Sequence, residues 1–260
     1  MLLLKIGILS IGNEVVKGRT VNSNSSEISS TLTSNGFDVS YHIACKDDQQ
    51  EICICLRFLM EKVGAVITTG GLGPTMDDIT IESIGKCLGE PVKANDKAMK
   101  FLKSKYSSLN LEMTEERLKM AKMPSSADII ENNTGTAPGM FLLFDGILIF
   151  SIPGVPREMR SMMPYILDKL GRSEKFYLSR EVRVDGIMES TIAHVIREVY
   201  EKMNNGVSIK SHPESFELNQ PVLIIEFYGY GDSKEDIEEK IKCTYKEMGK
   251  RVKDKFNKSI

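Results

Sequence analysis

The sequence lacks the features that mark several classes of protein. It has no apolar run near the roughly 20 residues that a membrane-spanning helix requires, no internal repeat, no low-complexity tract and no proline-rich linker. Its five cysteines are odd in number and form no Cys-x-x-Cys pair. We therefore expect neither a disulfide framework nor a zinc site, but free thiols in the reducing cytosol of a cytoplasmic protein with no membrane partner.

The charge distribution and the common catalytic motifs exclude further classes. The formal net charge is -2, and the lysines alternate with acids, as in residues 235–240. A protein that binds nucleic acid usually carries a concentrated basic face, so we expect no nucleic-acid partner. The chain has no Walker motif, no Gly-x-Ser-x-Gly elbow and no His-Glu-x-x-His motif, and its three histidines are too scattered to predict a catalytic set.

Short apolar runs alternate with amphipathic stretches through the first two thirds of the chain, a pattern typical of βαβ units. We predict an α/β fold with a three-layer, mainly parallel sheet over residues 1–171, followed by a small α+β domain over residues 172–260. The predicted strands of the first domain are 2–11, 39–44, 65–69, 140–144 and 147–151, and its helices are 24–36, 49–62, 95–123 and 156–170. The second domain reads as a β-α-β-β-α module, with elements at 180–184, 188–203, 207–211 and 222–230 and a charged C-terminal helix.

The strongest chemical signal is the segment 68–80, Thr-Thr-Gly-Gly-Leu-Gly-Pro-Thr-Met-Asp-Asp-Ile-Thr, between a predicted strand and a predicted helix. Glycines at the carboxyl end of a parallel strand let the backbone approach a ligand, and the N–H groups that open the next helix attract anions. We therefore predict a phosphate site made by Gly70, Gly71, Gly73, Thr75 and Thr80. Asp77 and Asp78 would repel a phosphate without a cation, which favours a hard metal such as Mg²⁺. In the alternative reading, one aspartate caps the helix and the glycines only turn the chain.

Three other segments lie at the ends of predicted strands: residues 12–24 and 152–159 each follow a strand, and residues 132–139 precede one. Loops of a doubly wound sheet converge at one edge, so Glu14 is a candidate metal ligand or base facing the two aspartates. Alternatively Glu14 is simply exposed, and Asn24, a second candidate for the ligand site, mainly caps the next helix. The segments 132–139 and 152–159 fit a pocket rim, with candidate residues Gly135, Thr136, Gly139, Gly154 and Arg157. The planar fork of Arg157 suits phosphate; in the alternative it lies with Glu158 on the solvated side of a helix.

In this order, the segments resemble the N-terminal domain of the CinA (competence/damage-inducible protein A) family, a branch of the MoaB/Mog molybdopterin-binding fold. The resemblance covers about residues 4–170, and the tail from Arg180 resembles the small α/β domain that follows in that family. The matching segments are Gly12-Asn13-Glu14, 18–24, Asp47-Asp48, 69–80, 135–139 and 153–159.

The resemblance implies a divalent-metal-dependent ADP-ribose pyrophosphatase, a hydrolase that releases AMP and ribose 5-phosphate with Mg²⁺, Mn²⁺ or Co²⁺. Asp77 and Asp78 would hold the metal or position water, Glu14 would assist as a ligand or base, and Thr136 and Gly139 would line the nucleotide side. The partner would be a small nucleotide-like molecule, and the protein a homo-oligomer. Full-length bacterial members carry a further nicotinamide-nucleotide amidohydrolase domain; we expect none here and do not carry deamidation over.

Two alternatives stay open. A molybdopterin-binding or adenylyl-transfer protein of molybdenum-cofactor synthesis would use the same fold and glycine loop, although the spelling Leu72-Gly73-Pro74-Thr75 favours CinA. The other alternative is a non-catalytic ligand-binding module. It is favoured by Asn13 and Asn22, which stand where the family commonly has aspartate, so that other acids must carry most of any metal chemistry.

Overall fold

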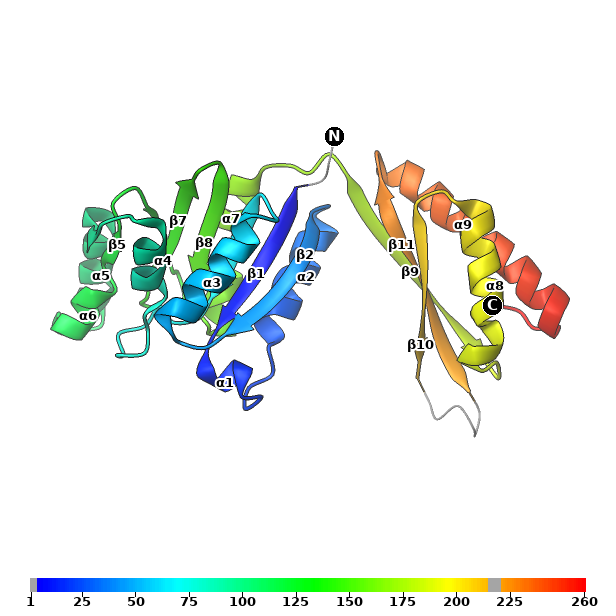
Figure 1. Cartoon of the computed structure of the whole chain (residues 1–260), viewed down its shortest axis with the longest axis horizontal. Coiled ribbons are helices and arrows are strands. Elements are labelled where there is room, and N and C mark those ends of the chain that lie inside the picture. Colours follow the sequence, from blue (N-terminus) through cyan, green and yellow to red (C-terminus); the bar gives the residue numbers. More distant parts are fainter. Residues whose placement is uncertain (1–3, 215–220) are drawn as a thin grey trace. The chain divides into compact units, whose positions relative to one another are not determined.

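The chain divides into two compact units. The computed structural model describes residues 4–214 and 221–260 (Figure 1). One unit comprises the residues up to Thr33 together with Phe37–Arg172, and the other comprises Ser34–Gly36 together with Ser173–Ile260. Residues 2 and 3 of the first predicted strand lie outside the described residues. Within the described ranges, no helix is long and apolar enough to cross a membrane.

The first unit is built on a six-stranded sheet in the order β2-β1-β3-β8-β7-β6. Neighbours among β2, β1, β3 and β8 pair in parallel, whereas β7 pairs antiparallel with both β8 and β6. The mainly parallel sheet predicted from the sequence is therefore confirmed. The predicted strands 140–144 and 147–151 form a hairpin that turns at Asp145 and Gly146, both at positive φ. The strands are β1 (Lys5–Ile11), β2 (Asp38–Cys45), β3 (Ala65–Thr69), β6 (Asp128–Ile130), β7 (Gly139–Phe144) and β8 (Ile147–Ile152).

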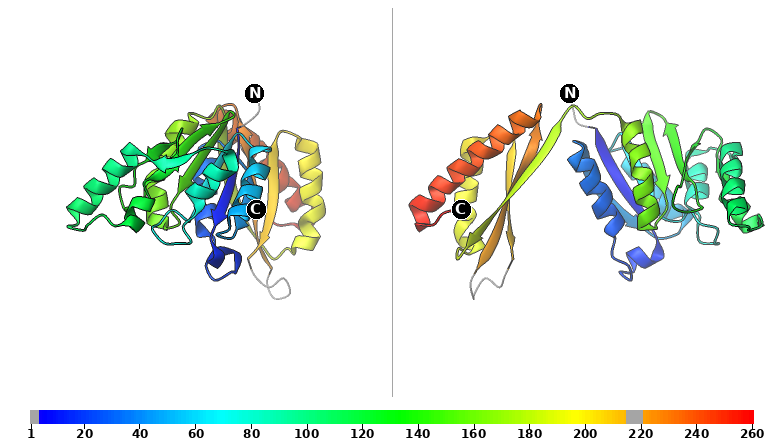
Figure 2. Two further views of the ribbon diagram at one scale, coloured as in Figure 1. Left: turned by 60° about the vertical axis from the view of Figure 1, so that its left-hand side comes forward. Right: turned by 180° about the vertical axis from the view of Figure 1, so that it is seen from behind.

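Helices cover both faces of this sheet. Alternate residues of β1 enter different cores: Ile6 and Ile8 pack with α2 and α7, and Leu9 and Ile11 pack with α3, α4 and α5. Seen from behind, α2 and α7 lie together on one face (Figure 2), so the predicted three layers are confirmed. The helices are α1 (Asn13–Val16), α2 (Ser23–Ser34), α3 (Gln49–Met60), α4 (Thr80–Leu88), α5 (Asp96–Ser108), α6 (Glu115–Lys119) and α7 (Pro156–Leu170).

The segment 95–123, predicted as a single helix, has a different structure. It contains two helices, α5 and α6, and then a short strand β5 (Lys122–Pro124), which pairs antiparallel with β4 (Val92–Ala94). Moreover, Ala98 and Leu102 of α5 are fully buried in a core of the first unit. Strands of three residues are too short to show an alternating pattern, and for this reason the sequence did not reveal them.

The second unit has the predicted β-α-β-β-α order. Its antiparallel sheet has the order β10-β11-β9, and α8 and α9 cover one face of it. Along β11, Leu223, Ile225 and Phe227 are buried while the residues between them are partly exposed, the period of a strand with one covered face. The elements are β9 (Phe176–Asp185), α8 (Glu189–Met203), β10 (Val207–Pro213), β11 (Val222–Gly231) and α9 (Lys234–Phe256).

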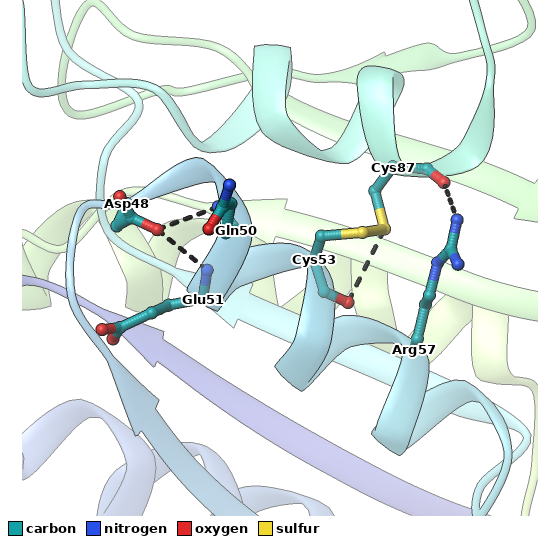
Figure 3. The surroundings of a disulfide bond; sticks show 6 residues. All are labelled: Asp48, Gln50, Glu51, Cys53, Arg57 and Cys87. Carbon is teal, nitrogen blue, oxygen red and sulfur yellow. Dashed lines mark hydrogen bonds between the residues drawn. A yellow bond between two sulfur atoms is a disulfide. The ribbon is translucent and has the colours of Figure 1, made fainter.

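A disulfide between Cys53 and Cys87 joins α3 to α4 (Figure 3). The prediction of free thiols throughout is therefore wrong for this pair, whose α-carbons lie 5.3 Å apart. Arg57 supports the same contact, because its guanidinium donates to the backbone oxygen of Cys87 at 3.0 Å. Of the remaining cysteines, Cys45 is buried and its burial raises the pKa of its thiol to about 12.

Candidate functional site

A cavity of about 490 Å³ lies at the carboxyl edge of the parallel strands. Each of these strands leads directly into its wall: Asp47 follows β2, Glu14 follows β1, the glycine loop 70–79 follows β3, and Gly154 follows β8. The open crevice outside the carboxyl ends of the strands is where α/β sheets bind their ligands. The convergence predicted from the sequence is thus present in the first unit.

The base of the glycine loop is held by backbone contacts. Gly70 has φ +106°, and its N–H donates to the oxygen of Ile152 at 3.0 Å. The Thr80 hydroxyl donates to the oxygen of Gly70 at 2.8 Å, and the Thr80 N–H donates to the oxygen of Gly71 at 3.2 Å. Thr80 is fully buried and does not line the cavity. Its role is to close the loop, and not the phosphate contact that the sequence suggested.

The Thr75 side chain contacts the carboxylates of both Asp77 and Asp78. The Thr75 hydroxyl contacts Asp77 and is 2.6 Å from Oδ2 of Asp78, which also accepts from the Thr75 N–H at 2.8 Å. The hydrogen bond from Thr75, together with the nearby Lys119 ammonium, keeps the pKa of Asp77 below its ordinary value. Thr75 itself does not line the cavity. Its hydroxyl serves the two carboxylates, which do line the cavity.

The cavity is acidic. Among the residues that the structure describes, its lining contains no lysine, arginine or histidine. Burial, with the charges of Glu14 and Asp77, raises the pKa of Asp47. Asp47 also accepts a hydrogen bond from the N–H of Asn13 at 2.8 Å, which holds its carboxylate beside the segment that follows β1. The carboxylates in the lining are Glu14, Asp47, Asp77, Asp78 and Glu158. A cleft lined by one sign of charge concentrates counter-ions, here cations.

Three of these carboxylates rest against glycines. A Cβ on Gly73 would lie 2.6 Å from Oδ2 of Asp78, a distance that real Cβ atoms essentially never show. Similar overlaps, at 2.5 and 2.3 Å, pair Glu14 with Gly12 and Glu158 with Gly135. These glycines therefore make room for acidic side chains, a role that the sequence reading had not given them.

Asn24 does not cap α2 as the sequence suggested. It is the second residue of that helix, and Oδ1 of Asn22 accepts the N–H of Ser25 instead, at 3.4 Å. The Asn24 amide donates to Oγ1 of Thr69 at 3.2 Å and to the oxygen of Gly154 at 2.8 Å. Its own Oδ1 is buried with no hydrogen-bond partner among the described residues, and the residue lines the cavity. Asn24 therefore offers an acceptor to a ligand.

The segment 132–139 is organised by Asn132. Its fully buried amide donates to Oε2 of Glu158 at 2.7 Å and to the oxygen of Ala137 at 2.9 Å. Thr136 lines the cavity, as predicted, and Glu158 is held at its edge. Gly139, by contrast, is buried in β7, where a Cβ would meet Ser151 and Met162.

The structure gathers most of the candidate residues and leaves some apart. The cavity is lined by Glu14, Asn24, Gly70, Gly71, Gly73, Asp77, Asp78, Thr136 and Gly154, but not by Thr75, Thr80, Gly135, Gly139 or Arg157. Arg157 is exposed on α7, but Glu158, which the alternative reading placed beside it on the solvated side, lines the cavity. Sequence reasoning missed Asp47 and Glu158 as lining residues, although Asp47 stood only three residues after a predicted strand.

The chain is similar in sequence and fold to known proteins. The family model described as probable molybdopterin binding domain matches residues 7–172. A protein from Caldivirga maquilingensis is 38% identical over 247 residues, covering 95% of this chain and 96% of its own, and one from Sulfurisphaera tokodaii is 39% identical over 244 residues, covering 93% and 92%. The crystal structure of the protein CinA from Thermoplasma acidophilum superposes with a TM-score of 0.62 and 37% identity, covering 65% of this chain and 99% of that one.

Proposed function

Because the chain belongs to the probable molybdopterin binding domain family and is similar to CinA, we propose that it hydrolyses a nucleotide pyrophosphate with the help of a divalent metal. ADP-ribose is the proposed substrate, with AMP and ribose 5-phosphate as products. The observation that carries the proposal is the row of carboxylates beside a glycine loop at the ends of parallel strands. That arrangement suits a phosphate group only when a cation is shared between the two.

The side chains fit such a cation. Among the residues that the structure describes, no three His, Cys, Asp or Glu side chains form a ready-made metal cluster. Mg²⁺ is commonly bound by only one or two protein carboxylates, with substrate phosphates and waters as its other ligands. Asp77 and Asp78, which share the Thr75 hydroxyl, supply such a pair. When bound, the metal would neutralise charge on the phosphate oxygens.

The chain's own groups would do the rest. The bends at Gly70 and Gly71 bring backbone, in place of side chains, up to the pyrophosphate. Glu14, exposed to the cavity after β1, would accept a proton from the attacking water on a carboxylate oxygen. Water attack on one phosphorus then breaks its bond to the bridging oxygen, which leaves with the other phosphate. Asn24 and Asn132 hold the opposite wall in place through Gly154 and Glu158.

Turnover tests the proposal. The purified protein is incubated with ADP-ribose and Mg²⁺, Mn²⁺ or Co²⁺, and AMP and ribose 5-phosphate are quantified by chromatography. We expect Asp78→Asn to lower kcat by about 10²-fold or more, because one carboxylate of the pair is lost at the reacting centre. The matched control is Asp168→Asn, an exposed aspartate of α7 outside the cavity, which should keep full activity.

Two outcomes would contradict the proposal. Absence of turnover with every metal would favour the non-catalytic ligand-binding module, the alternative that Asn13 and Asn22 support. An Asp78→Asn protein as active as the Asp168→Asn control would mean that the metal is held elsewhere.

A second candidate function is molybdopterin binding, favoured by the description of the matching family model. The same cavity and glycine loop would then receive a pterin phosphate. Expression in a host that makes molybdopterin, followed by oxidation and fluorescence analysis of any pterin released from the purified protein, distinguishes the two. A stoichiometric pterin would replace the pyrophosphatase proposal.

A further inference from the structure

Glu158 stands apart from the other carboxylates of the acidic cavity. It lies in the first turn of α7, in the segment that follows β8, whereas the other four lie in segments that follow β1, β2 and β3. Its side chain is partly exposed and lines the cavity, so a ligand there can reach it. The proposed metal pair, Asp77 and Asp78, and the proposed base, Glu14, leave this fifth carboxylate without a role in the chemistry.

A fully buried amide, that of Asn132, holds the Glu158 carboxylate. Nδ2 of Asn132 donates to Oε2 of Glu158 at 2.7 Å and to the oxygen of Ala137 at 2.9 Å. Oδ1 of Asn132 accepts the N–H groups of Thr134 and Gly135, at 3.1 and 2.7 Å. Because both ends of the amide are engaged in this way, its orientation is fixed, and it presents a donor to Glu158.

Gly135 lets the Glu158 carboxylate lie against the main chain. A Cβ on Gly135 would stand 2.3 Å from Cδ of Glu158, and 2.4 and 2.6 Å from Oε1 and Oε2. Both oxygens therefore lie beside Gly135. Within the described ranges, Oε2 accepts from Asn132, and no hydrogen bond or ion pair engages Oε1. Since a carboxylate has about four acceptor positions, most of them remain for a ligand.

The surroundings of Glu158 select the kind of group that it can accept from. A phosphate is repelled by a carboxylate, and Glu158 belongs to no group of three metal-binding side chains in the described part of the chain. No aromatic side chain of the described residues lines the cavity, so a base would find no ring to stack on. A sugar hydroxyl is a neutral donor, and its hydrogen bond to a carboxylate is charge-assisted.

We propose that Glu158 determines specificity for ribose, by accepting hydrogen bonds from the neighbouring 2- and 3-hydroxyl groups of a ribose phosphate. The inference rests on the proposed function for its substrate, which contains two such sugars. An acidic residue recognises a ribose hydroxyl in the same way in dinucleotide-binding folds. Glu158 and the metal pair line one cavity, so a ribose and its phosphate can occupy it together. Asn132 is then a positioning residue.

Binding of monophosphates tests the inference without catalysis, because AMP and ribose 5-phosphate contain no pyrophosphate bond. Calorimetric titrations with Mg²⁺ present compare AMP with 2′-deoxy-AMP, and ribose 5-phosphate with 2-deoxyribose 5-phosphate. The original protein should bind at least one of the two ribose compounds about tenfold or more tightly than its deoxy counterpart, because the missing hydrogen bond is one to a charged group. The pair of compounds that differs identifies which ribose of the substrate contacts Glu158.

Glu158→Gln removes the charge and keeps the shape of the side chain. The glutamine oxygen would accept from Asn132 and its NH₂ group would face the ligand, so the affinity ratio of the two compounds should fall to within about threefold. The matched control is Glu61→Gln, an exposed glutamate of the same unit outside the cavity, which should keep the original ratio. A merely structural role of Glu158 would weaken both compounds equally and leave the ratio unchanged.

The comparison of ribose with deoxyribose in the original protein does not depend on the folding of any variant. Ratios near one for both pairs, a ratio that Glu158→Gln leaves unchanged, or no binding of either ribose compound would each overturn the inference. Cleavage of ADP-ribose by a protein with both ratios near one would overturn this inference alone. A ratio that depends on Glu158 in a protein that never cleaves ADP-ribose would uphold it and contradict the proposed catalysis.

Discussion

Replacing Gly70 by alanine should destabilise the first unit far more than the same change at Gly18. Both glycines lie in that unit and both have positive φ, +106° at Gly70 and +68° at Gly18. A Cβ on Gly70 would stand 2.1 Å from the backbone oxygen of Ile11, whereas no atom of another described residue beyond its chain neighbours lies within 4 Å of a Cβ on Gly18. The pair thus separates the cost of the backbone conformation from the cost of the close contact.

The expected magnitudes follow from these two terms. A left-handed conformation costs an L-residue roughly 1–2 kcal/mol, and the reduced entropy of the unfolded chain returns about 0.4–1 kcal/mol. Gly18→Ala should therefore lower the free energy of unfolding by between about 0 and 1.6 kcal/mol. Gly70→Ala adds an overlap with main-chain atoms, which costs typically 1–3 kcal/mol when the packing must shift.

Urea denaturation followed by far-ultraviolet circular dichroism measures both variants. Because the two glycines report on the same unit, the same transition is compared, and the slope with denaturant checks that the unfolded state is unchanged. Equal losses of stability in the two variants would refute the close approach of Gly70 to β1, and with it the account of why the loop begins with glycine.

Two further predictions concern the cysteines. Cys53→Ser/Cys87→Ser should lower the free energy of unfolding by about 4 kcal/mol, the chain-entropy value for a crosslink that spans 34 residues. The control Cys243→Ser should leave the urea midpoint unchanged. Equal shifts of the midpoint in the double variant and the control would argue against the crosslink. Cys45 should resist iodoacetamide at pH 8 in the native protein, because a pKa of about 12 leaves only about 10⁻⁴ of it as thiolate. Since this folded-state pKa exceeds the ordinary 9.0, the thiol's contribution to stability is complete below pH 9 and is lost as the pH rises toward 12; native labelling of Cys45 as fast as that of the exposed Cys243 would contradict its burial.

The sequence predicted those elements whose hydrophobic residues follow a regular local pattern. Buried parallel strands appear as short apolar runs, so β3 and the placement of the glycine loop could be predicted, and Pro156 marked the first turn of α7. The edge at which the loops converge followed from the geometry of parallel sheets alone. Each of these features is determined by residues close together in the sequence or by the general geometry of parallel sheets.

Features that depend on distant neighbours could not be predicted. Glu158 reads as a solvated helix residue until Asn132, 26 positions earlier, is seen to hold it at the cavity. The Cys53–Cys87 pair lies on separate helices, and no spacing rule connects cysteines whose helices happen to pack together. For the same reason Thr80 was assigned to a ligand, because its partner is a main-chain oxygen ten residues away.

The closed base of the glycine loop has a consequence for how specificity can change. The loop 70–79 is closed at its base, where Thr80 donates hydrogen bonds to the backbone oxygens of Gly70 and Gly71. The disulfide then fixes the following helix, α4, to α3. The tip of the loop, in contrast, projects into solvent, with Met76 95% exposed. Met76 is the neighbour of Asp77, so a substitution at the tip changes the surroundings of the carboxylates at little cost in stability, while the fixed base keeps the loop at the carboxyl end of β3. Recognition and folding thus reside in different residues of a single short segment, which allows one to diverge without the other.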